Sequence, residues 1–173
     1  MSDARGQSLV ELALIIPLLL FMALGVFDFA RVFTASITIE AAAREAADFG
    51  ALYRWNWKDV ASATTTEANM QARACSAAST LTDYEGDPPS DIATCTNPTF
   101  SYQLINDTSY ANCYDVPRGD DPCRVEVTLE FEFNVIVPLG IQFGDATLGL
   151  PQQVTLTRTS TFAVSDFELD EEP

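Results

Sequence analysis

A continuous apolar segment without any charged residue runs from Leu12 to Phe27, near the start of the chain. With its flanks, from about Leu9 to Ala30, it covers roughly 22 residues, or about 33 Å of helix at 1.5 Å per residue. This length is enough to cross the hydrocarbon core of a bilayer. The segment is therefore predicted to be embedded in a membrane, as a single span, at some stage.

The helical pattern continues beyond this span, through the text DFARVFTASITIEAAAREAADFGALY. Apolar residues recur there at intervals of three to four, and Asp28 and Arg31 are spaced to meet on a helix surface. The alternative, a cleaved secretory signal peptide, has a positive start and a shorter core, and it has no reason to continue into a second helical segment. We predict one helix from about Ser8 to Leu52, about 65 Å long, with Gly50 as its terminator.

The residues around the start of the apolar run distinguish it from a simple membrane anchor. Gly6 is followed by a polar residue and a short apolar step, and Glu11 is the fifth residue after the glycine. This arrangement resembles the processing site of type IV pilin-like proteins. The longer text RGQSLVELALIIPLLLFMALGVFDFARVF, followed by AAAREAA, resembles the TadE-like subunits of tight-adherence (Flp) pilus systems over about the first 50 residues.

The resemblance implies a structural subunit whose leader, residues 1–6, is removed by a prepilin peptidase. Cleavage after Gly6, on the cytoplasmic side, would make Gln7 the new N-terminus. The other implied partners are pilin subunits (copies of this chain or a major pilin), the inner-membrane pilus assembly platform, and membrane lipid before assembly. The implied location is a single-pass membrane protein with a cytoplasmic N-terminus, which then joins a surface filament or remains on the periplasmic side.

Glu11 places a carboxylate almost at the start of the apolar run. In hydrocarbon such a carboxylate is costly unless it becomes neutral or meets a cation. The α-ammonium that cleavage would create on Gln7, in the same or a neighbouring subunit, is such a cation, and Glu11 would then set the register between packed helices. The alternative is that Glu11 reaches from the helix end to the membrane interface. The two arrangements are compatible, one in the membrane and one in a filament.

Pro17 and Gly25 are further unusual residues for a membrane helix. Proline removes a helix hydrogen bond, and glycine loosens the helix by roughly 1 kcal/mol relative to alanine. The resemblance to pilins implies that the helix melts between these residues on packing into a filament, whereas a simple transmembrane kink is the alternative. Asp28 ends the uncharged run about 26 Å after Glu11, so the two carboxylates bracket the hydrocarbon. Arg31 is the predicted partner of Asp28.

Four cysteines, Cys75, Cys95, Cys113 and Cys123, all lie beyond the span. The chain has no C-x-x-C spacing and no histidine, which disfavours a zinc site without excluding four thiolate ligands. Two disulfides in an oxidising compartment are the favoured interpretation, which puts the distal part outside the cytoplasm. Of the three connectivities, Cys75 with Cys95 and Cys113 with Cys123 gives the shortest loops and is preferred, although the sequence alone does not decide among them.

Residues 53–166 are predicted to form a small α+β domain, with residues 7–52 as the long helix before it and residues 167–173 as an acidic tail. The text YRWNWKD is expected to pack where the long helix meets the domain. A second helix is predicted from about Thr65 to Ala78, because Thr64 and Glu67 have the spacing of a capping box.

Three segments of the domain alternate between apolar and polar residues, as strands do: residues 99–105, 124–137 and 152–164. They predict an antiparallel sheet with one polar face and one face packed on helix. Residues 83–98 are expected to form a loop, and residues 138–151 a long connection rather than a tight hairpin.

No catalytic residues are expected, because the chain has no histidine, nucleophile elbow or phosphate loop. The formal net charge of −16 argues against nucleic acid as a partner. No cofactor is expected; two acidic groups offer oxygens for calcium, but neither matches a calcium loop. The first is Asp83, Glu85, Asp87 and Asp91, and the second is Asp115, Asp120 and Asp121.

Two classes of function remain. The first is a structural pilin-like subunit, and the second is a membrane-anchored binding protein or adhesin that does not polymerise. The processing site and the helical extension past Asp28 favour the first class, since a mere anchor needs neither.

Overall fold

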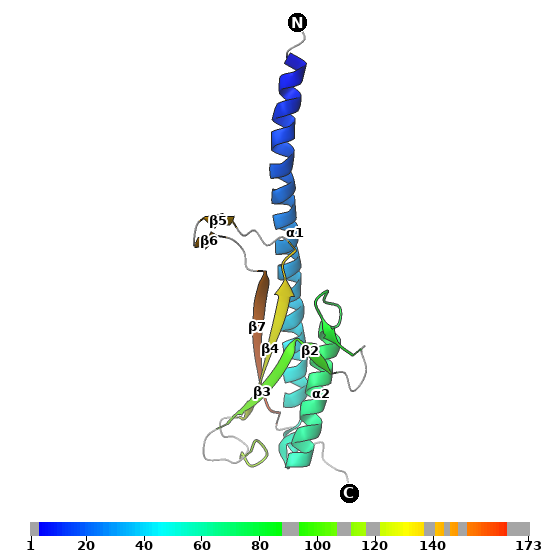
Figure 1. The fold of residues 1–173 in the computed structure, drawn as a ribbon. Helices are drawn as coiled ribbons and strands as arrows, with labels where there is room; N and C mark the ends of the chain where they lie inside the picture. Colours follow the sequence, from blue (N-terminus) through cyan, green and yellow to red (C-terminus); the bar gives the residue numbers. More distant parts are fainter. Residues whose placement is uncertain are drawn as a thin grey trace. The chain divides into compact units, whose positions relative to one another are not determined.

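The computed structural model describes residues 4–87, 94–106, 112–116, 122–136, 141–143, 146–148 and 152–165. The chain divides into two units, one of Met1–Thr34 with Asn134–Val154 and the other of Ala35–Phe133 with Thr155–Pro173. The fold is α+β, as the sequence predicts: a long apolar N-terminal helix accompanies a short helix and antiparallel strands (Figure 1).

Helix α1 spans Ala4–Ala51 and includes Pro17, in good agreement with the predicted helix. The role predicted for Gly50 is wrong, because Gly50 lies inside the last turn rather than after it. A Cβ added there would lie 2.6 Å from Met70 Sδ and 3.1 Å from Val125 Cγ1. Close packing against α2 and β4, rather than helix termination, therefore explains the glycine.

In the first unit, two short strands form a hairpin, β5 (Ile141–Phe143) and β6 (Ala146–Leu148). They are antiparallel, with Ile141 opposite Leu148 and Phe143 opposite Ala146. This hairpin lies within the long connection predicted between the strands now labelled β4 and β7, and the sequence did not predict it. Strands of three residues are too short to produce a visible alternation in the sequence.

In the second unit, a 3₁₀ turn, η1 (Arg54–Trp57), joins α1 to α2 (Val60–Ala78). Helix α2 begins five residues before the predicted Thr65. Its N-cap is Asp59, whose carboxylate accepts a 2.8 Å hydrogen bond from the Ser62 amide. Thr64 is therefore not a cap: it lies inside the helix, and its hydroxyl donates back to the Val60 carbonyl.

The main sheet has the strand order β3 (Thr99–Ile105), β4 (Arg124–Asn134) and β7 (Gln153–Ala163). Strands β3 and β4 pair antiparallel, with Thr99 opposite Glu130 and Ile105 opposite Arg124. The hydroxyls of Thr128 and Thr159 are hydrogen-bonded to each other, and the Thr161 hydroxyl donates to the Glu126 carboxylate. Because the residue numbers fall along β4 as they rise along β7, this pair is antiparallel too. Figure 1 shows the three strands side by side.

One face of β4 forms the core, as its alternation predicts. The buried residues of this face are Val125, Val127, Leu129, Phe131 and Phe133. The C-terminal half of α1 supplies a stripe of small buried residues, Ala35, Ala42, Ala43, Ala46 and Ala47, with Ile39 as the one large side chain among them. Small side chains let neighbouring elements approach the helix backbone closely, which is how a slender helix and a three-stranded sheet share one core.

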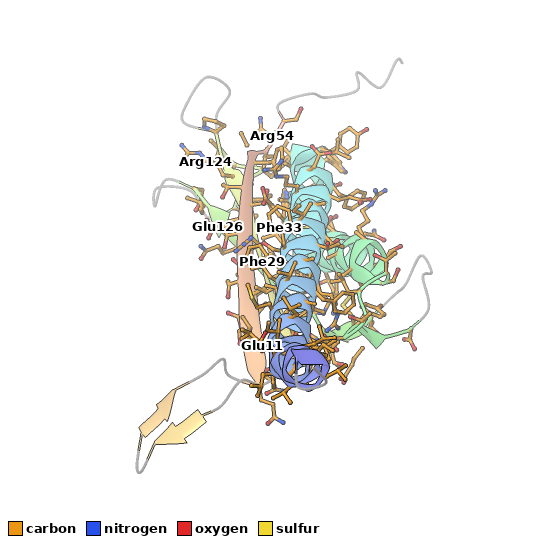
Figure 2. All side chains as sticks on the ribbon, turned by 90° about the horizontal axis from the view of Figure 1, so that it is seen from above. Glu11, Phe29, Phe33, Arg54, Arg124 and Glu126 are labelled. Carbon is orange, nitrogen blue, oxygen red and sulfur yellow. A yellow bond between two sulfur atoms is a disulfide. The ribbon has the colours of Figure 1, made fainter. Side chains whose placement is uncertain are left out.

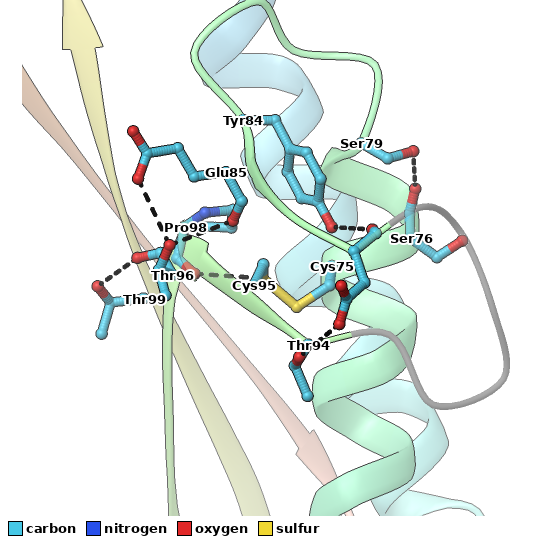
Figure 3. The surroundings of a disulfide bond; sticks show 11 residues. Cys75, Ser76, Ser79, Tyr84, Glu85, Thr94, Cys95, Thr96, Pro98 and Thr99 are labelled. Atoms are coloured by element: carbon cyan, nitrogen blue, oxygen red, sulfur yellow. Dashed lines mark hydrogen bonds between the residues drawn. A yellow bond between two sulfur atoms is a disulfide. The ribbon is translucent and has the colours of Figure 1, made fainter.

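The structure contains the disulfides Cys75–Cys95 and Cys113–Cys123, the two pairs with the shortest loops. Cys75 is buried on α2, and Cys95 begins β2 (Cys95–Asn97), which pairs with β1 (Glu85–Gly86) (Figure 3). Residues 83–98 were expected to be loop only, so this two-stranded ribbon is a correction.

The ribbon is also tied to the main sheet. The Asn97 side chain accepts from the Glu132 amide and donates to the Glu132 carbonyl, each at 2.9 Å, in the way that a neighbouring strand would. The disulfide and this amide therefore hold the ribbon at both α2 and β4.

Candidate functional site

The N-terminal part of α1 exposes an unusually large apolar surface. Nearly every large apolar side chain from Leu9 to Phe33 is exposed, and Phe29 keeps 72% of its surface. Figure 2, viewed from above, shows the Phe29 and Phe33 side chains on this helix together with Glu11. Soluble monomers rarely expose a contiguous apolar surface of this extent. By length and composition, the helix is long and apolar enough to cross a membrane, which indicates single-pass anchoring through α1.

The residues of the predicted processing site lie in the first turns of this helix. Gly6 and Gln7 belong to α1, and Glu11 follows Gln7 by four residues, so that these two positions share one face. Glu11 is exposed at the surface of the isolated chain. Gly6, Gln7 and Glu11 thus lie at the start of the exposed apolar surface, and cleavage after Gly6 stays a prediction.

Pro17 and Gly25 do not interrupt the helix in the isolated chain, since α1 is continuous through both. An added Cβ at Gly25 would meet no atom within 4 Å among the described residues. Packing within the chain therefore does not require glycine at this position. The predicted melting between the two residues concerns a packed filament and stays a prediction.

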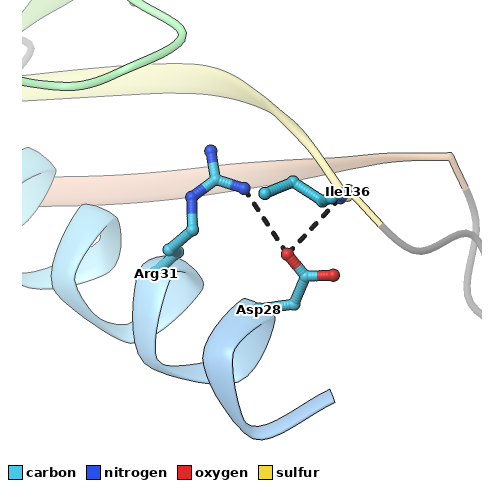
Figure 4. Close-up of polar contacts among 3 residues, drawn as sticks. All are labelled: Asp28, Arg31 and Ile136. Atoms are coloured by element: carbon cyan, nitrogen blue, oxygen red, sulfur yellow. Dashed lines mark hydrogen bonds and ion pairs between the residues drawn. The ribbon is translucent and has the colours of Figure 1, made fainter. Parts of the chain in front are cut away.

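Asp28 is the first charged residue after the apolar run, and it is 5% exposed. Its Oδ1 atom accepts from Arg31 Nη1 and from the backbone amide of Ile136, each at 3.4 Å (Figure 4). The pairing with Arg31 follows the predicted spacing, whereas the Ile136 contact comes from 108 residues later in the chain. Asp28 thus connects the helix to the segment that follows β4, within the first unit.

The joint between α1 and α2 is built around aromatic and basic residues. The Trp57 indole is buried and donates a 2.9 Å hydrogen bond to the Gly50 carbonyl. The Arg54 guanidinium donates to the carbonyls of Tyr114 and Val116, which both closely follow Cys113 in the sequence. The sequence indicated an aromatic joint, but no local pattern reveals a partner 60 residues away.

Among the described residues of the second unit, three side chains have shifted pKa values. Burial raises the pKa of the Tyr102 phenol, and the nearby Glu67 carboxylate, 3.5 Å from the hydroxyl, raises it further. Burial is also the main cause of the raised pKa of the Tyr84 phenol, and the negative charge of Asp87 raises it further. The backbone hydrogen bond from Ser62 lowers the pKa of Asp59, as expected for a helix cap.

The two acidic groups considered for calcium do not form a metal site within the described residues, where no three His, Cys, Asp or Glu side chains gather. Asp87 instead accepts a 3.1 Å hydrogen bond from the Thr94 hydroxyl. Asp91, Asp120 and Asp121 lie outside the described residues, as does the acidic tail of residues 167–173.

The model of the family described as TadE-like protein matches residues 6–48. The resemblance is therefore confirmed over the segment that carries it, which contains the predicted processing site, the exposed apolar surface and the stripe of buried alanines. Proteins of this family are structural and pilus-associated rather than enzymatic. No curated protein and no solved structure matches the chain.

Proposed function

We propose, from the TadE-like segment at residues 6–48, that this chain is a structural pilin-like subunit of a tight-adherence pilus. The observation that carries the proposal is the coincidence of that segment with the exposed apolar surface of residues 9–33. In this function α1 is first a membrane span and then a packing element in a filament or its assembly complex. The second unit, with its disulfides and sheet, is the part presented outside the membrane.

The exposed apolar side chains support a role in packing because they must be covered by something. Burying one Leu or Phe side chain is worth about 1.5–3 kcal/mol relative to leaving it in water. Lipid tails cover this surface in the membrane, and the helices of neighbouring subunits cover it in a filament. Transfer of α1 from the membrane to a filament exchanges one apolar environment for another. Polar groups, rather than the apolar area buried, therefore decide the axial register between neighbouring helices.

Glu11 is the polar group proposed to set this register. Removal of residues 1–6 by a prepilin peptidase leaves an α-ammonium on Gln7, one helical turn from Glu11. In an apolar environment a carboxylate is stabilised most by a cation in direct contact. A contact between Glu11 and the Gln7 ammonium of a neighbouring subunit therefore favours one axial position over the others.

The disulfides support the proposed orientation, because they form in oxidising compartments. With Cys75, Cys95, Cys113 and Cys123 outside the cytoplasm, a single span places the N-terminus on the cytoplasmic side, where the peptidase and the assembly platform act on it.

The N-terminus of the native protein tests the proposal. Mass spectrometry is applied to two samples, the fraction sheared from the cell surface and the membrane fraction. We expect the sheared chain to begin at Gln7, lighter than the full chain by the mass of residues 1–6. A chain that begins at Met1 and remains in the membrane contradicts the proposal and supports a membrane-anchored binding protein instead.

Two glycine variants provide a matched comparison. Gly6→Leu is expected to block cleavage and to leave the chain in the membrane. Gly25→Leu makes the same substitution in the same helix, where an added Cβ meets no described atom within 4 Å, and is expected to be cleaved normally. Equal cleavage of both variants refutes Gly6 as part of the processing site.

The role of Glu11 is tested separately with Glu11→Gln. This variant keeps the shape of the side chain and removes its charge, so cleavage is expected to continue while the amount of chain in the sheared fraction falls. Glu40→Gln is the control, because Glu40 lies on the same helix and pairs with Arg44 at the surface. An equal loss in both variants shows that the effect is not specific to Glu11.

A further inference from the structure

An open hollow with a volume of about 360 Å³ lies in the second unit, where the end of α1, η1 and the first turns of α2 meet. Phe49 contributes from α1, Trp55 and Asn56 contribute from η1, and Thr65 and Asn69 contribute from α2. None of the described residues that line the hollow carries a charge, although the chain has a formal net charge of −16. The described lining of the hollow therefore differs from the chain as a whole, which is strongly acidic.

Hydrogen bonds within the chain hold the walls of the hollow in place. The Trp57 indole anchors η1 to the Gly50 carbonyl at 2.9 Å. The Thr66 hydroxyl, itself buried, contacts the Ser62 carbonyl at 2.9 Å and the Asn56 carbonyl at 3.4 Å, and so links α2 to η1. A cavity whose walls are already in place loses little entropy when a ligand enters.

Several groups in the hollow are available to a ligand. The side-chain amides of Asn56 and Asn69 make no hydrogen bond to any described residue, and each offers both donors and an acceptor. The Trp55 side chain is 54% exposed, and the Lys58 ammonium lies 4.0 Å from its ring centroid. The Trp55 ring also packs against the Tyr114 ring in a T-shaped pair, with the centroids 5.5 Å apart, so the hollow offers a ligand the exposed part of the indole and the two amides.

We propose that this η1–α2 hollow binds a neutral saccharide of one or two rings. The C–H faces of a sugar pack on an aromatic ring, and its hydroxyls both donate and accept, which matches the amide groups of Asn56 and Asn69. The volume lies at the lower end of the range of about 300–1,000 Å³ for small-molecule sites. None of the described lining residues is cationic, so an acidic sugar gains no ion pair from the lining. This site goes beyond the pilin-like function and depends neither on cleavage nor on polymerisation.

The test is a titration of the full chain, purified in a zwitterionic detergent that contains no sugar. The probes are glucose, galactose, N-acetylglucosamine, maltose, lactose and N,N′-diacetylchitobiose, with N-acetylneuraminic acid as the charged sugar and the peptide Gly-Ser-Gly-Tyr as the competing class. NMR follows the side-chain amide resonances of Asn56 and Asn69 and the indole resonance of Trp55. We expect at least one neutral sugar to shift these resonances in a saturable way, and neither the acidic sugar nor the peptide to do so.

Two threonine variants provide the matched control. The Thr64 and Thr65 hydroxyls make the same kind of bond, to the carbonyl four residues earlier, at 2.8 and 3.0 Å, but only Thr65 lines the hollow. Thr65→Val and Asn69→Leu are each expected to weaken sugar binding by about two- to tenfold, the effect of one lost hydrogen bond. Thr64→Val is expected to leave it unchanged, and circular dichroism checks that all three variants remain folded.

Three results overturn the proposal. The first is the absence of a saturable shift with every neutral sugar, and the second is an equal or larger shift with the acidic sugar or the peptide. The third is a loss of binding in Thr64→Val as large as that in Thr65→Val. Each result leaves the N-terminal cleavage experiment unaffected, so the two proposals fail independently.

Discussion

Removing each disulfide in turn should reveal how much of the stability of the second unit depends on covalent bonds. Cys75–Cys95 closes a loop with a sequence separation of 20, and Cys113–Cys123 closes one of 10. In the chain-entropy relation, these lengths correspond to about 3.3 and about 2.7 kcal/mol at 25 °C. A domain of this size is typically stable by only about 5–15 kcal/mol, so either loss is a substantial fraction.

The measurement compares oxidised and reduced forms of two variants, each of which keeps one disulfide. Cys113→Ala/Cys123→Ala isolates the first bond, and Cys75→Ala/Cys95→Ala isolates the second. Within each variant, reduction changes no side-chain packing partner other than the sulfur atoms, so the difference in urea unfolding free energy reports the remaining disulfide. We expect the difference to be larger for the variant that retains Cys75–Cys95, because its loop is longer.

The wild-type chain provides the check on additivity, because its reduction should cost about the sum of the two differences when the bonds act independently. A difference below about 1 kcal/mol in either variant refutes the loop-entropy reasoning for that bond. A larger difference for Cys113–Cys123 than for Cys75–Cys95 refutes the predicted order.

Three further predictions concern packing and ionisation in the second unit. Gly50→Val should lower the free energy of unfolding, measured with urea, by about 1–3 kcal/mol through overpacking. In the double variant with Met70→Ala, the loss of unfolding free energy should be smaller than the sum of the losses in the two single variants. The Tyr102 phenol has a raised pKa in the folded state. Its contribution to stability is therefore fully present below about pH 10 and is lost as the pH rises through the folded pKa. Tyr102→Phe should flatten the dependence of the unfolding free energy on pH above about pH 10. The Asp59 carboxylate has a lowered pKa, so its contribution is present above about pH 3.8 and is lost as the pH falls through the folded value. Asp59→Asn should keep the cap and remove this acid dependence, which far-ultraviolet circular dichroism can follow.

The long periodic elements could be predicted from the sequence because many residues repeat one pattern. Helix α1 and the buried face of β4 are examples, since a period of about 3.6 or of 2 extends over most of their length. The start of α2 could not be predicted correctly, because Thr64 and Glu67 imitate a capping box inside the helix. The true cap, Asp59, has a side chain equally suited to the task but no glutamate three residues later.

Contacts between distant residues were the other part that the sequence did not reveal. The Arg54 bonds to the 114–116 segment and the Ile136 bond to Asp28 join positions 60 to 108 residues apart. No local pattern encodes such pairs. The same applies to the η1–α2 hollow, whose lining comes from three successive elements and whose amides look like ordinary surface residues in the sequence.

Helix α1 has two different kinds of surface, which differ in the size and the burial of their side chains. Before Thr34, large side chains such as Leu18 and Phe29 are exposed around the helix. After it, small side chains such as Ala42 and Ala46 are buried on one face of the second unit. Large side chains around a helix suit lipid or neighbouring helices, which adapt to the surface, whereas a small-residue stripe suits one fixed neighbour at close range. The change in side-chain size along α1 therefore separates the part of the helix that packs within the second unit from the part whose large apolar side chains stay exposed.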